Sequence, residues 1–258
     1  MTLHSLLSTI HKYCESSLRS LIISALKQGP IPRHISFVMD GNRRFARKIN
    51  VKTQMGHSMG FTKLKEVLEI CMDLGVEVVT VYAFSIENFK RPREEVDFLM
   101  GLARTKLLEL CEQNEVVHKH GIRIRVLGNR SYIPSDVLEV IDKVSKLTEN
   151  NTGPTLNICF PYTSRDEITA AIQKVAGRVK DGELKESDIS QQLLEEHLYT
   201  AGCPKLDVWV RTSGEIRLSD FLLWQAANNC QIHFVDCYWP EFSIWQLLPI
   251  ILNYQLAR

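Results

Sequence analysis

The sequence predicts an α/β fold: a single domain with a central, mostly parallel six-stranded sheet flanked by helices. Three observations lead to this prediction. Six short apolar runs, rich in β-branched residues, are distributed along the 258 residues. Amphipathic helical patterns separate these runs, and a regular alternation of strands with helices is typical of a parallel sheet. The composition is 45% apolar and 24% charged, which is typical of a globular chain long enough to bury one full core.

The six expected strands are the apolar runs themselves. The first run, "ISFVM", begins at residue 35 and ends immediately before Asp40. The other five span residues 76–84, 122–128, 155–160, 206–212 and 232–236. Their short length and their content of Val and Ile favour strands over helices.

Five helical patterns lie between the strands. Apolar positions at Phe61, Leu64, Leu68 and Cys71 form the first, and Gly75 is expected to cap its C-terminus. The second spans residues 93–118 and begins after Pro92 with an acidic pair, which favours a helix start. The remaining three are expected to begin at Ser135, at a capping box of Ser164 and Glu167, and at Ser187 or Ser190.

Residues 1–28 form a separate N-terminal segment with the pattern of an amphipathic helix, ahead of a domain spanning residues 29–258. The apolar stripe recurs every three or four positions, at Leu3, Leu7, Ile10, Cys14, Leu18, Leu21 and Ala25. This pattern fits either a helix packed on its own domain or a helix on a membrane surface. No apolar run reaches the roughly 18 residues that a membrane span needs, and no signal-peptide pattern is present.

The charged residues and cysteines exclude some classes of function. The formal net charge is only +1, whereas a nucleic-acid binder usually carries a clear basic excess. Six cationic residues nonetheless gather within residues 33–52 against Asp40 alone, and such local focusing suits a small polyanion. The seven cysteines form no C-x-x-C pair, so reduced, buried thiols are expected rather than zinc or disulfides.

Polar segments follow all six expected strands. They are "DGNRR" (40–44), "SIENFKR" (85–91), "GNR" (128–130), "PYTSRDE" (161–167), "RTSGEIRLS" (211–219) and "DCYWPE" (236–241). In an open α/β sheet, ligands bind beyond the carboxyl ends of the strands. Any single loop fits ordinary solvation, but several arginine-bearing loops at one edge indicate an anion-binding site.

The first of these loops combines one carboxylate with a cluster of cations. Arg43 and Arg44 can clamp a diphosphate through paired hydrogen bonds, and Gly41 allows close approach of the backbone. A helix over residues 42–48 would add free N–H groups. We predict Asp40 as a ligand of Mg²⁺ bound to the same phosphates, with a structural ion pair to a neighbouring arginine as the alternative.

A second anion site is predicted at Arg211, Arg217 and Ser219, although Ser219 also fits the N-cap of a following helix. Two cationic cradles and one Mg²⁺ suggest two phosphorylated substrates that are joined to each other. The sequence has no G-x-x-x-x-G-K-[ST], G-x-G-x-x-G or G-x-S-x-G motif, which argues against a P-loop, a dinucleotide site and a hydrolase elbow. An Asp-Asp-x-x-Asp motif is also absent.

Five ordered motifs resemble those of the cis-prenyltransferase family, from about residue 29 to the last residue given. They are "HISFVMDGNRRFARK" (34–48), "GHSMGF" (56–61), "VYAFSIENFKRP" (81–92), "RTSGEIRLSDFLLWQ" (211–225) and "YWPEF" (238–242). They are most similar to the eukaryotic catalytic subunits of dehydrodolichyl diphosphate synthase, with a fungal character, and more distantly similar to bacterial undecaprenyl diphosphate synthases.

The resemblance implies repeated cis condensation of isopentenyl diphosphate onto an allylic diphosphate, typically farnesyl diphosphate, with Mg²⁺ as the cofactor. It implies a long-chain polyprenyl (dehydrodolichyl) diphosphate as the product, used for dolichol synthesis and protein glycosylation. The family lacks Asp-rich metal motifs, in agreement with their absence here. An apolar tunnel between the sheet and the helices at 58–74 and 93–118 would set the product length, and Ala83 would leave room in it.

The resemblance also implies roles for individual residues. The allylic diphosphate would be bound by Gly41, Asn42, Arg43, Arg44, His57 and Arg91, with Asp40 holding Mg²⁺, and isopentenyl diphosphate by Arg211, Arg217 and Ser219. Phe45 and Phe89 would line the reacting prenyl groups, and Asn88 with Ser85 would serve removal of the C2 proton. An amide is a poor base, so Asn88 is expected to orient the proton acceptor. Taken without the resemblance, Asn88 and His57 are turn, loop or cap residues, and the two phenylalanines are core residues.

Three departures from the family pattern bear on partners. Thr53 stands where bacterial members carry an arginine, and the segment around Cys230 and Gln231 lacks their glutamate. The sequence ends "NYQLAR" without the R-x-G motif of homodimeric members. This implies a Nogo-B-receptor-type accessory subunit that supplies the motif, and a chain continuing beyond residue 258 is the alternative.

The expected location is the cytosolic face of the endoplasmic reticulum membrane, with peripheral membrane contact through the N-terminal helix. Two other functions compete with prenyl transfer. A non-catalytic, partner-binding subunit of the same fold should lack Asp40 or the arginine clusters, and both are present. A nucleic-acid binder using residues 33–52 is disfavoured by the near-neutral net charge.

Overall fold

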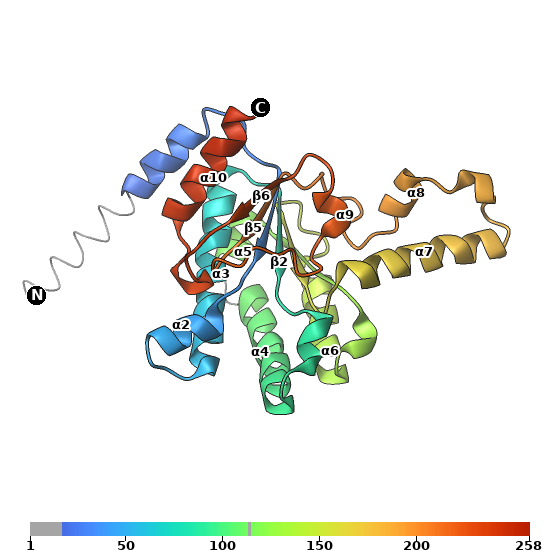
Figure 1. Cartoon of the computed structure of the whole chain (residues 1–258), viewed down its shortest axis with the longest axis horizontal. Helices are drawn as coiled ribbons and strands as arrows, with labels where there is room; N and C mark the ends of the chain where they lie inside the picture. Colours follow the sequence, from blue (N-terminus) through green and yellow to red (C-terminus); the bar gives the residue numbers. More distant parts are fainter. Residues whose placement is uncertain (1–16, 113–114) are drawn as a thin grey trace, which may run out of the picture.

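The computed structural model describes residues 17–112 and 115–258, and its centre is a sheet of six strands within those residues (Figure 1). The strands are β1 (His34–Val38), β2 (Val78–Tyr82), β3 (Arg123–Leu127), β4 (Thr155–Cys159), β5 (Val208–Arg211) and β6 (Gln231–Phe234). Every neighbouring pair is parallel, in the order β3-β4-β2-β1-β5-β6. The predicted fold class is confirmed, and each strand starts and ends within one residue of its predicted run or inside it.

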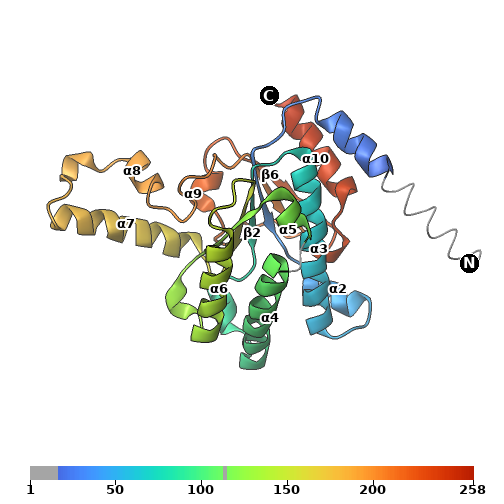
Figure 2. The ribbon, with the colours of Figure 1, turned by 180° about the vertical axis from the view of Figure 1, so that it is seen from behind.

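Helices cover both faces of the sheet (Figures 1 and 2). The α-helices are α2 (Asn42–Lys48), α3 (Thr53–Leu74), α4 (Arg93–Glu112), α5 (Glu115–His120), α6 (Ser135–Thr148), α7 (Ser164–Lys180), α8 (Gln191–Glu195), α9 (Leu223–Ala226) and α10 (Ile244–Leu256). Short 3₁₀ turns are η1 (Ile86–Lys90), η2 (Arg130–Tyr132), η3 (Glu186–Asp188) and η4 (Trp239–Glu241). The central strands β1 and β5 are buried at every position, as expected for parallel strands covered on both sides.

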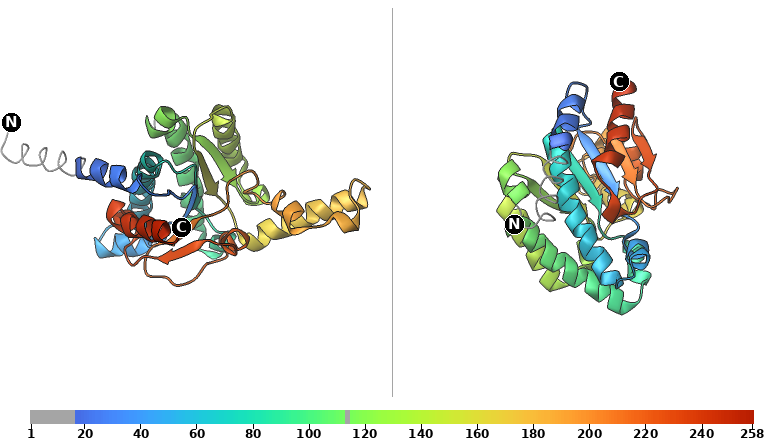
Figure 3. Two further views of the ribbon diagram at one scale, coloured as in Figure 1. Left: turned by 90° about the horizontal axis from the view of Figure 1, so that it is seen from above. Right: turned by 90° about the vertical axis from the view of Figure 1, so that its left-hand side faces the viewer.

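The apolar core has two parts, one on each face of the sheet. The larger part includes Phe37, Leu68 and Trp239 and involves α3, α4, α6 and α10. The smaller part surrounds Trp209 and Phe221 on the face toward α9. The pair α7 and α8 projects away from both parts to one side of the molecule (Figure 3).

The helix boundaries confirm some of the predicted caps and correct others. Gly75 ends α3 in the left-handed region (φ 92°), with its N–H bonded to Cys71 O and Met72 O, and Ser190 caps α8. Ser135 is the first residue of α6 and not its cap, because the chain enters the helix through Pro134.

The capping box predicted for α7 is also wrong. Thr163 is the N-cap and accepts a hydrogen bond from the N–H of Asp166 at 3.3 Å. Ser164 Oγ instead accepts from the N–H of Leu223 at 2.8 Å. Glu167 Oε1 accepts from the N–H of Tyr199 at 2.7 Å. Ser164 and Glu167 therefore make contacts with distant residues and do not form the local capping box.

The described part of the N-terminal segment packs on its own domain. Residues 17–26 are helical, and Ile23 and Leu26 are buried in the larger core. Arg19 pairs with Glu69 at 3.2 Å and with Asp73 at 3.0 Å, both on α3. Leu3, Leu7, Ile10 and Cys14 lie outside the described residues, so the division at residue 28 and the membrane alternative stay predictions.

Two further expectations can be checked in the described residues. No helix among them is both long and apolar enough to cross a membrane. The six cysteines at 71, 111, 159, 203, 230 and 237 are free; the first three are buried, as expected, and the other three are only partly buried.

Candidate active site

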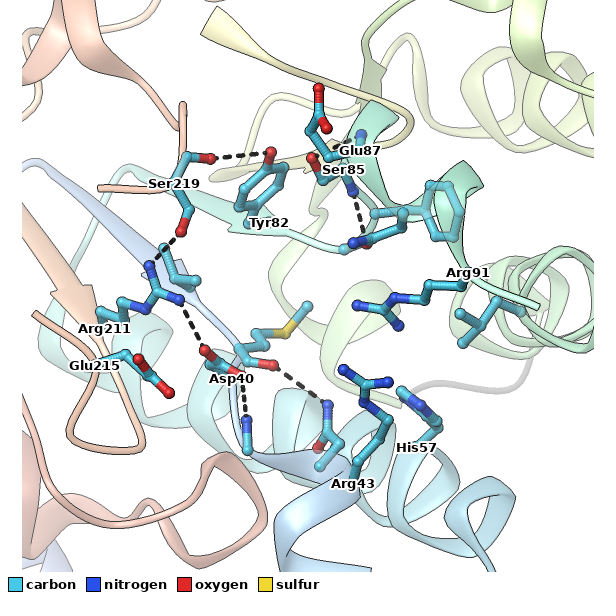
Figure 4. Close-up of a pocket in the computed structure, with 18 of the residues that line it drawn as sticks. Asp40, Arg43, His57, Tyr82, Ser85, Glu87, Arg91, Arg211, Glu215 and Ser219 are labelled. Atoms are coloured by element: carbon cyan, nitrogen blue, oxygen red, sulfur yellow. Dashed lines mark hydrogen bonds and ion pairs between the residues drawn. The ribbon is translucent and has the colours of Figure 1, made fainter. Parts of the chain in front are cut away.

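A cavity of about 850 Å³ lies beyond the carboxyl ends of β1, β2 and β5 (Figure 4). Of the predicted site residues, its lining contains Asp40, Gly41, Asn42, Arg43, Arg44, His57, Ser85, Asn88, Arg91, Arg211, Arg217 and Ser219. The structure therefore brings together residues that are far apart in the sequence, at the edge where an open α/β sheet binds ligands. Their individual roles stay predictions.

The cavity lining is strongly cationic. Its arginines are Arg43, Arg44, Arg47, Arg91, Arg165, Arg211 and Arg217. Its acidic residues are Asp40, Glu87, Glu215 and Asp220. Seven guanidinium groups against four carboxylates give a concave surface that attracts polyanions.

Asp40 and Arg211 form the centre of one side of the cavity. Arg211 Nη2 donates to Asp40 Oδ2 at 2.8 Å, and Arg211 Nη1 donates to Ser219 Oγ at 2.6 Å. The N–H of Gly41 donates to Asp40 Oδ1 at 2.7 Å. Burial acts to raise the pKa of Asp40, but the hydrogen bond and charge of Arg211, the N–H of Gly41 and the charge of Arg44 together hold that pKa below its usual value. The ion-pair alternative for Asp40 is thus present in the structure.

Glycine at position 41 is required by this arrangement. Gly41 has a left-handed φ of 97°, and a Cβ there would lie 2.8 Å from Tyr238 Cδ1 and 2.9 Å from Ser213 Cβ. Any side chain would force apart the turn that leads from β1 into α2, and so displace Asp40 and the arginines on either side of it.

Glu215 joins two more cations on the same side of the cavity. Its carboxylate lies 2.8 Å from Arg44 Nη1 and also pairs with Arg217. Arg44 Nη2 is in turn 3.5 Å from Asp40 Oδ1. We call the group of Asp40, Arg44, Arg211, Glu215 and Arg217 the Asp40 side.

Ser219 lies in a strained loop and does not cap a helix. Ser213, Ser219, Asp220 and Leu222 all have left-handed φ values, between 50° and 83°, which are costly for residues other than glycine. The N-cap of α9 is Leu222, and the hydroxyl of Ser219 accepts from Arg211. The predicted cap role of Ser219 is therefore wrong, because the chain turns again before the helix begins.

A second cationic group faces the Asp40 side across the cavity (Figure 4). Arg91 Nη1 donates to Glu95 Oε1 at 3.0 Å, and Arg43 Nη1 lies 3.6 Å from the same oxygen. Burial, followed by the positive charge of Arg91, lowers the pKa of His57 to about 4, so the ring is neutral at pH 7. His57 Nε2 is buried and has no hydrogen-bonding partner among the described residues. We call Arg43, His57, Arg91 and Glu95 the Arg91 side.

Ser85, Asn88 and Tyr82 also line the cavity. The N–H of Ser85 donates to Asn88 Oδ1 at 3.1 Å, and the N–H of Glu87 donates to Ser85 Oγ at 3.2 Å, so Asn88 has the cap role that was its alternative while also lining the cavity. The hydroxyl of Tyr82 contacts the carbonyl oxygen of Ser219 at 3.4 Å. Tyr82 therefore links the end of β2 to the loop after β5.

The remaining predicted residues, Phe45 and Phe89, are absent from the cavity lining. Phe45 is buried on α2, and Phe89 packs edge-on against Phe84 with ring centroids 5.0 Å apart. Phe45 thus has the core position that was its alternative, and Phe89 is partly buried and packs against the larger core.

Lining residues that were not predicted include Tyr82, Arg165 and Glu215. Tyr82 is the last residue of β2, Arg165 lies in the first turn of α7, and Glu215 lies in the loop after β5. Arg165 and Glu215 could have been identified from the polar segments that follow β4 and β5, whereas Tyr82 could not, because it belongs to the strand itself.

The family of the chain follows from comparison with known proteins. Residues 38–258 match the family model of undecaprenyl diphosphate synthase. The chain belongs to this family, the cis-prenyltransferases. The resemblance seen in the five sequence motifs is thereby confirmed.

Curated relatives agree with this assignment. A dehydrodolichyl diphosphate synthase complex subunit of Schizosaccharomyces pombe is 46% identical over 241 residues, covering 93% of this chain and 91% of the relative. A human subunit with the same description is 51% identical, covering 90% of this chain and 69% of the relative. A geranylgeranyl-diphosphate-specific tritrans,polycis-undecaprenyl-diphosphate synthase of Thermococcus kodakarensis is 41% identical, covering 92% of this chain and 89% of the relative.

A solved structure also matches this cis-prenyltransferase. Lavandulyl diphosphate synthase from Lavandula x intermedia, in complex with dimethylallyl diphosphate, superposes with a TM-score of 0.79 at 30% identity. The match covers 87% of this chain and 95% of the lavender protein. The shared fold therefore extends over nearly the whole of both chains.

Mg²⁺ fits this cis-prenyltransferase site only together with substrate phosphates. Among residues 17–112 and 115–258, no group of three or more histidine, cysteine or acidic side chains could hold a metal ion. Mg²⁺ is commonly bound by one or two carboxylates plus phosphate oxygens and waters. Asp40 is a single carboxylate in a cavity that is also lined by arginines, and it suits that mode of binding.

A smaller apolar cavity of about 130 Å³ adjoins the cationic one. Its lining from α3 and α4 includes Phe61, Leu64, Leu102 and Leu107, and it shares Ala83 with the main cavity. The cavity lies between the helices that were expected to wall an apolar tunnel, although the tunnel itself stays a prediction.

Proposed function

We propose that this cis-prenyltransferase elongates farnesyl diphosphate by repeated condensation with isopentenyl diphosphate, and that it requires Mg²⁺. The observation that carries the proposal is the arrangement of two cationic groups facing each other across one cavity beside an apolar one. Two diphosphates can be held there side by side, with their prenyl groups directed toward the apolar residues.

The allylic diphosphate is assigned to the Arg91 side, together with Gly41, Asn42 and Arg44. Neutral His57 offers a hydrogen bond there without adding charge. As the diphosphate departs, the arginines stabilise its growing negative charge. When bound at Asp40 and the phosphates, Mg²⁺ would neutralise part of the same charge.

Isopentenyl diphosphate is assigned to Arg211, Arg217 and Ser219. Asn88 lies between the two diphosphates, and its Oδ1 is already used by the N–H of Ser85. Its NH₂ group meets no acceptor among the described residues and is available to hold a diphosphate oxygen. We assign to that oxygen, and not to the amide, the acceptance of the C2 proton, because an amide is a poor base.

The product is proposed to be a long-chain dehydrodolichyl diphosphate for dolichol synthesis and protein glycosylation. A growing chain enters the apolar cavity, which at 130 Å³ is smaller than the ~300–1,000 Å³ of typical ligand pockets. The cavity must therefore widen between α3 and α4 as the chain lengthens.

A partner and a membrane location complete the proposal. Two relatives are named as complex subunits, which supports a heteromer with a Nogo-B-receptor-type accessory subunit. Peripheral contact with the cytosolic face of the endoplasmic reticulum membrane is assigned to the N-terminal segment. The exposure of Leu18 and Leu21 on the helix at 17–26 supports this contact.

The test is incorporation of radiolabelled isopentenyl diphosphate with farnesyl or geranylgeranyl diphosphate. Each reaction is run with and without Mg²⁺, and with and without the accessory subunit. We expect chain elongation that is lost on chelation of Mg²⁺ and is faster with farnesyl diphosphate. A preference for geranylgeranyl diphosphate would revise the allylic substrate alone, whereas no product under any condition would contradict the proposal.

A further inference from the structure

Glu95 joins two guanidinium groups that come from distant parts of the chain. Arg43 lies on α2, Arg91 follows η1, and Glu95 lies in the first turn of α4. Both arginines reach the same carboxylate oxygen, Oε1, at 3.6 Å and 3.0 Å. Figure 4 shows the two guanidinium groups side by side, with His57 next to them. Glu95 itself is outside the cavity lining and its side chain is only 19% exposed.

Two guanidinium groups this close together repel each other. The charge of Arg43, after burial, is the next cause that lowers the pKa of Arg91. A carboxylate shared between them offsets the repulsion and limits the directions in which both planar groups can point. His57 also lies within the electrostatic reach of all three groups. The carboxylate therefore affects the spacing of the whole Arg91 side.

We propose that Glu95 is a positioning residue that holds Arg43 and Arg91 at the spacing needed to grip one diphosphate. This inference rests on the proposed function, specifically on the assignment of the allylic diphosphate to the Arg91 side. It predicts an effect on diphosphate binding that is opposite to the effect expected from the overall charge. Removing a negative charge beside a polyanion site strengthens binding through the overall field, whereas removing a positioning carboxylate weakens binding.

Glu94 provides a matched control for the charge. It is the preceding residue in the same helical turn and is exposed. Its side chain has no hydrogen bond or ion pair with any other described residue. Glu94→Gln therefore removes the same charge from nearly the same place without touching either arginine.

The experiment measures pyrophosphate binding by calorimetry to the chain itself, and separate KM values for the two substrates in the active enzyme. For Glu95→Gln we expect the Kd for pyrophosphate and the KM for the allylic diphosphate to rise by about tenfold. The KM for isopentenyl diphosphate should change by less than about twofold. Glu94→Gln should leave all three within about twofold, or lower them slightly. Glu95→Asp, which restores the charge on a shorter side chain, should give intermediate values.

The outcomes separate this inference from the proposed function. Equal or tighter pyrophosphate binding by folded Glu95→Gln, with an unchanged allylic KM, would overturn the positioning role while leaving prenyl transfer intact. Absence of turnover in the wild type would contradict the proposed function, and the calorimetry would still report on Glu95. If Glu95→Gln melts at a lower temperature than wild type, Glu95→Asp decides: recovery of part or all of the binding by a folded Asp variant supports the role of the carboxylate, and the same loss as Gln rejects it.

Discussion

The two sides of the cationic cavity carry similar charges but hold them differently. On the Asp40 side, three arginines share two carboxylates, and the side chain of Arg211 is only 4% exposed with both Nη atoms engaged. On the Arg91 side, two arginines share one oxygen of Glu95, and the side chain of Arg43 is 45% exposed. The Asp40 side is thus a closed ion-pair network, and the Arg91 side is an open pair of cations around a neutral histidine.

This difference has consequences for binding. A diphosphate can meet Arg43 and Arg91 without breaking an existing buried pair, so the Arg91 side costs little to occupy. On the Asp40 side, a phosphate or Mg²⁺ must compete with contacts already made within the protein, and breaking a buried pair is costly. We therefore expect substitutions on the Asp40 side to affect both stability and catalysis, and those on the Arg91 side to affect mainly binding.

Asp40→Asn should have the largest effect. It removes the proposed Mg²⁺ ligand and leaves Arg211 buried without its carboxylate, so kcat should fall by roughly 10³-fold or more. The free energy of unfolding should also fall, by about 1–3 kcal/mol. Product formation and urea unfolding measure the two effects. Asp142→Asn, which breaks an exposed pair with Arg130, serves as the control. Full turnover by the Asp40 variant would remove the metal assignment.

Arg211→Lys should come next, with a loss of roughly 10²-fold in kcat/KM. The guanidinium of Arg211 bonds Asp40, Ser219 and the carbonyl of Arg217 in three directions. A lysine ammonium cannot reproduce this planar geometry although it keeps the charge. Arg104→Lys, in an exposed pair with Asp136, should be silent. Activity close to wild type in Arg211→Lys would show that only the charge matters, and the contrast between the two sides would then be lost.

Arg217→Ala should have a smaller and more specific effect. Arg217 is 59% exposed and pairs only with Glu215 among the described side chains, so stability should change by less than about 0.5 kcal/mol. We expect the KM for isopentenyl diphosphate to rise by about tenfold and the KM for the allylic substrate to stay nearly constant. Initial-rate kinetics with each substrate varied in turn measure this. An effect confined to the allylic substrate would mean that the two diphosphate sites are assigned the wrong way round.

The sequence was a good guide wherever a structural feature depends on neighbouring residues. The strands could be predicted because short runs of β-branched residues suit buried parallel strands. The gathering of Asp40, Arg91 and Arg211 could be predicted because the carboxyl ends of parallel strands meet at one edge of a sheet. Local chemistry and topology were sufficient for both.

Features decided by long-range contacts could not be predicted in this way. Ser219 has the sequence pattern of an N-cap, but its hydroxyl accepts a hydrogen bond from Arg211 instead. Glu167 was expected to cap the start of α7, but its carboxylate accepts from the N–H of Tyr199. Glu95 looks like an ordinary acidic residue at a helix start. Only the packed structure shows that it meets Arg43, from an element on the other side of β2 in the sequence. Aromatic residues such as Phe89 fit either a cavity or a core until their neighbours are known.

The pH dependence of stability tests the environment of the histidine on the Arg91 side. Burial, followed by the charge of Arg91, lowers the pKa of His57 from its ordinary value of about 6.5 to about 4 in the folded protein. The unfolded state therefore holds more protons between these values, and stability should fall as the pH decreases from about 6.5 to about 4. His57→Gln removes this term, so its free energy of unfolding should decline less over that range, by on the order of 1–3 kcal/mol. Urea unfolding at several pH values measures the difference, with exposed His118→Gln as the control. If the free energy of unfolding changed with pH in the same way for wild type and His57→Gln, the ring would be solvated like that of a surface histidine. The Arg91 side would then be more open to solvent than its structure indicates.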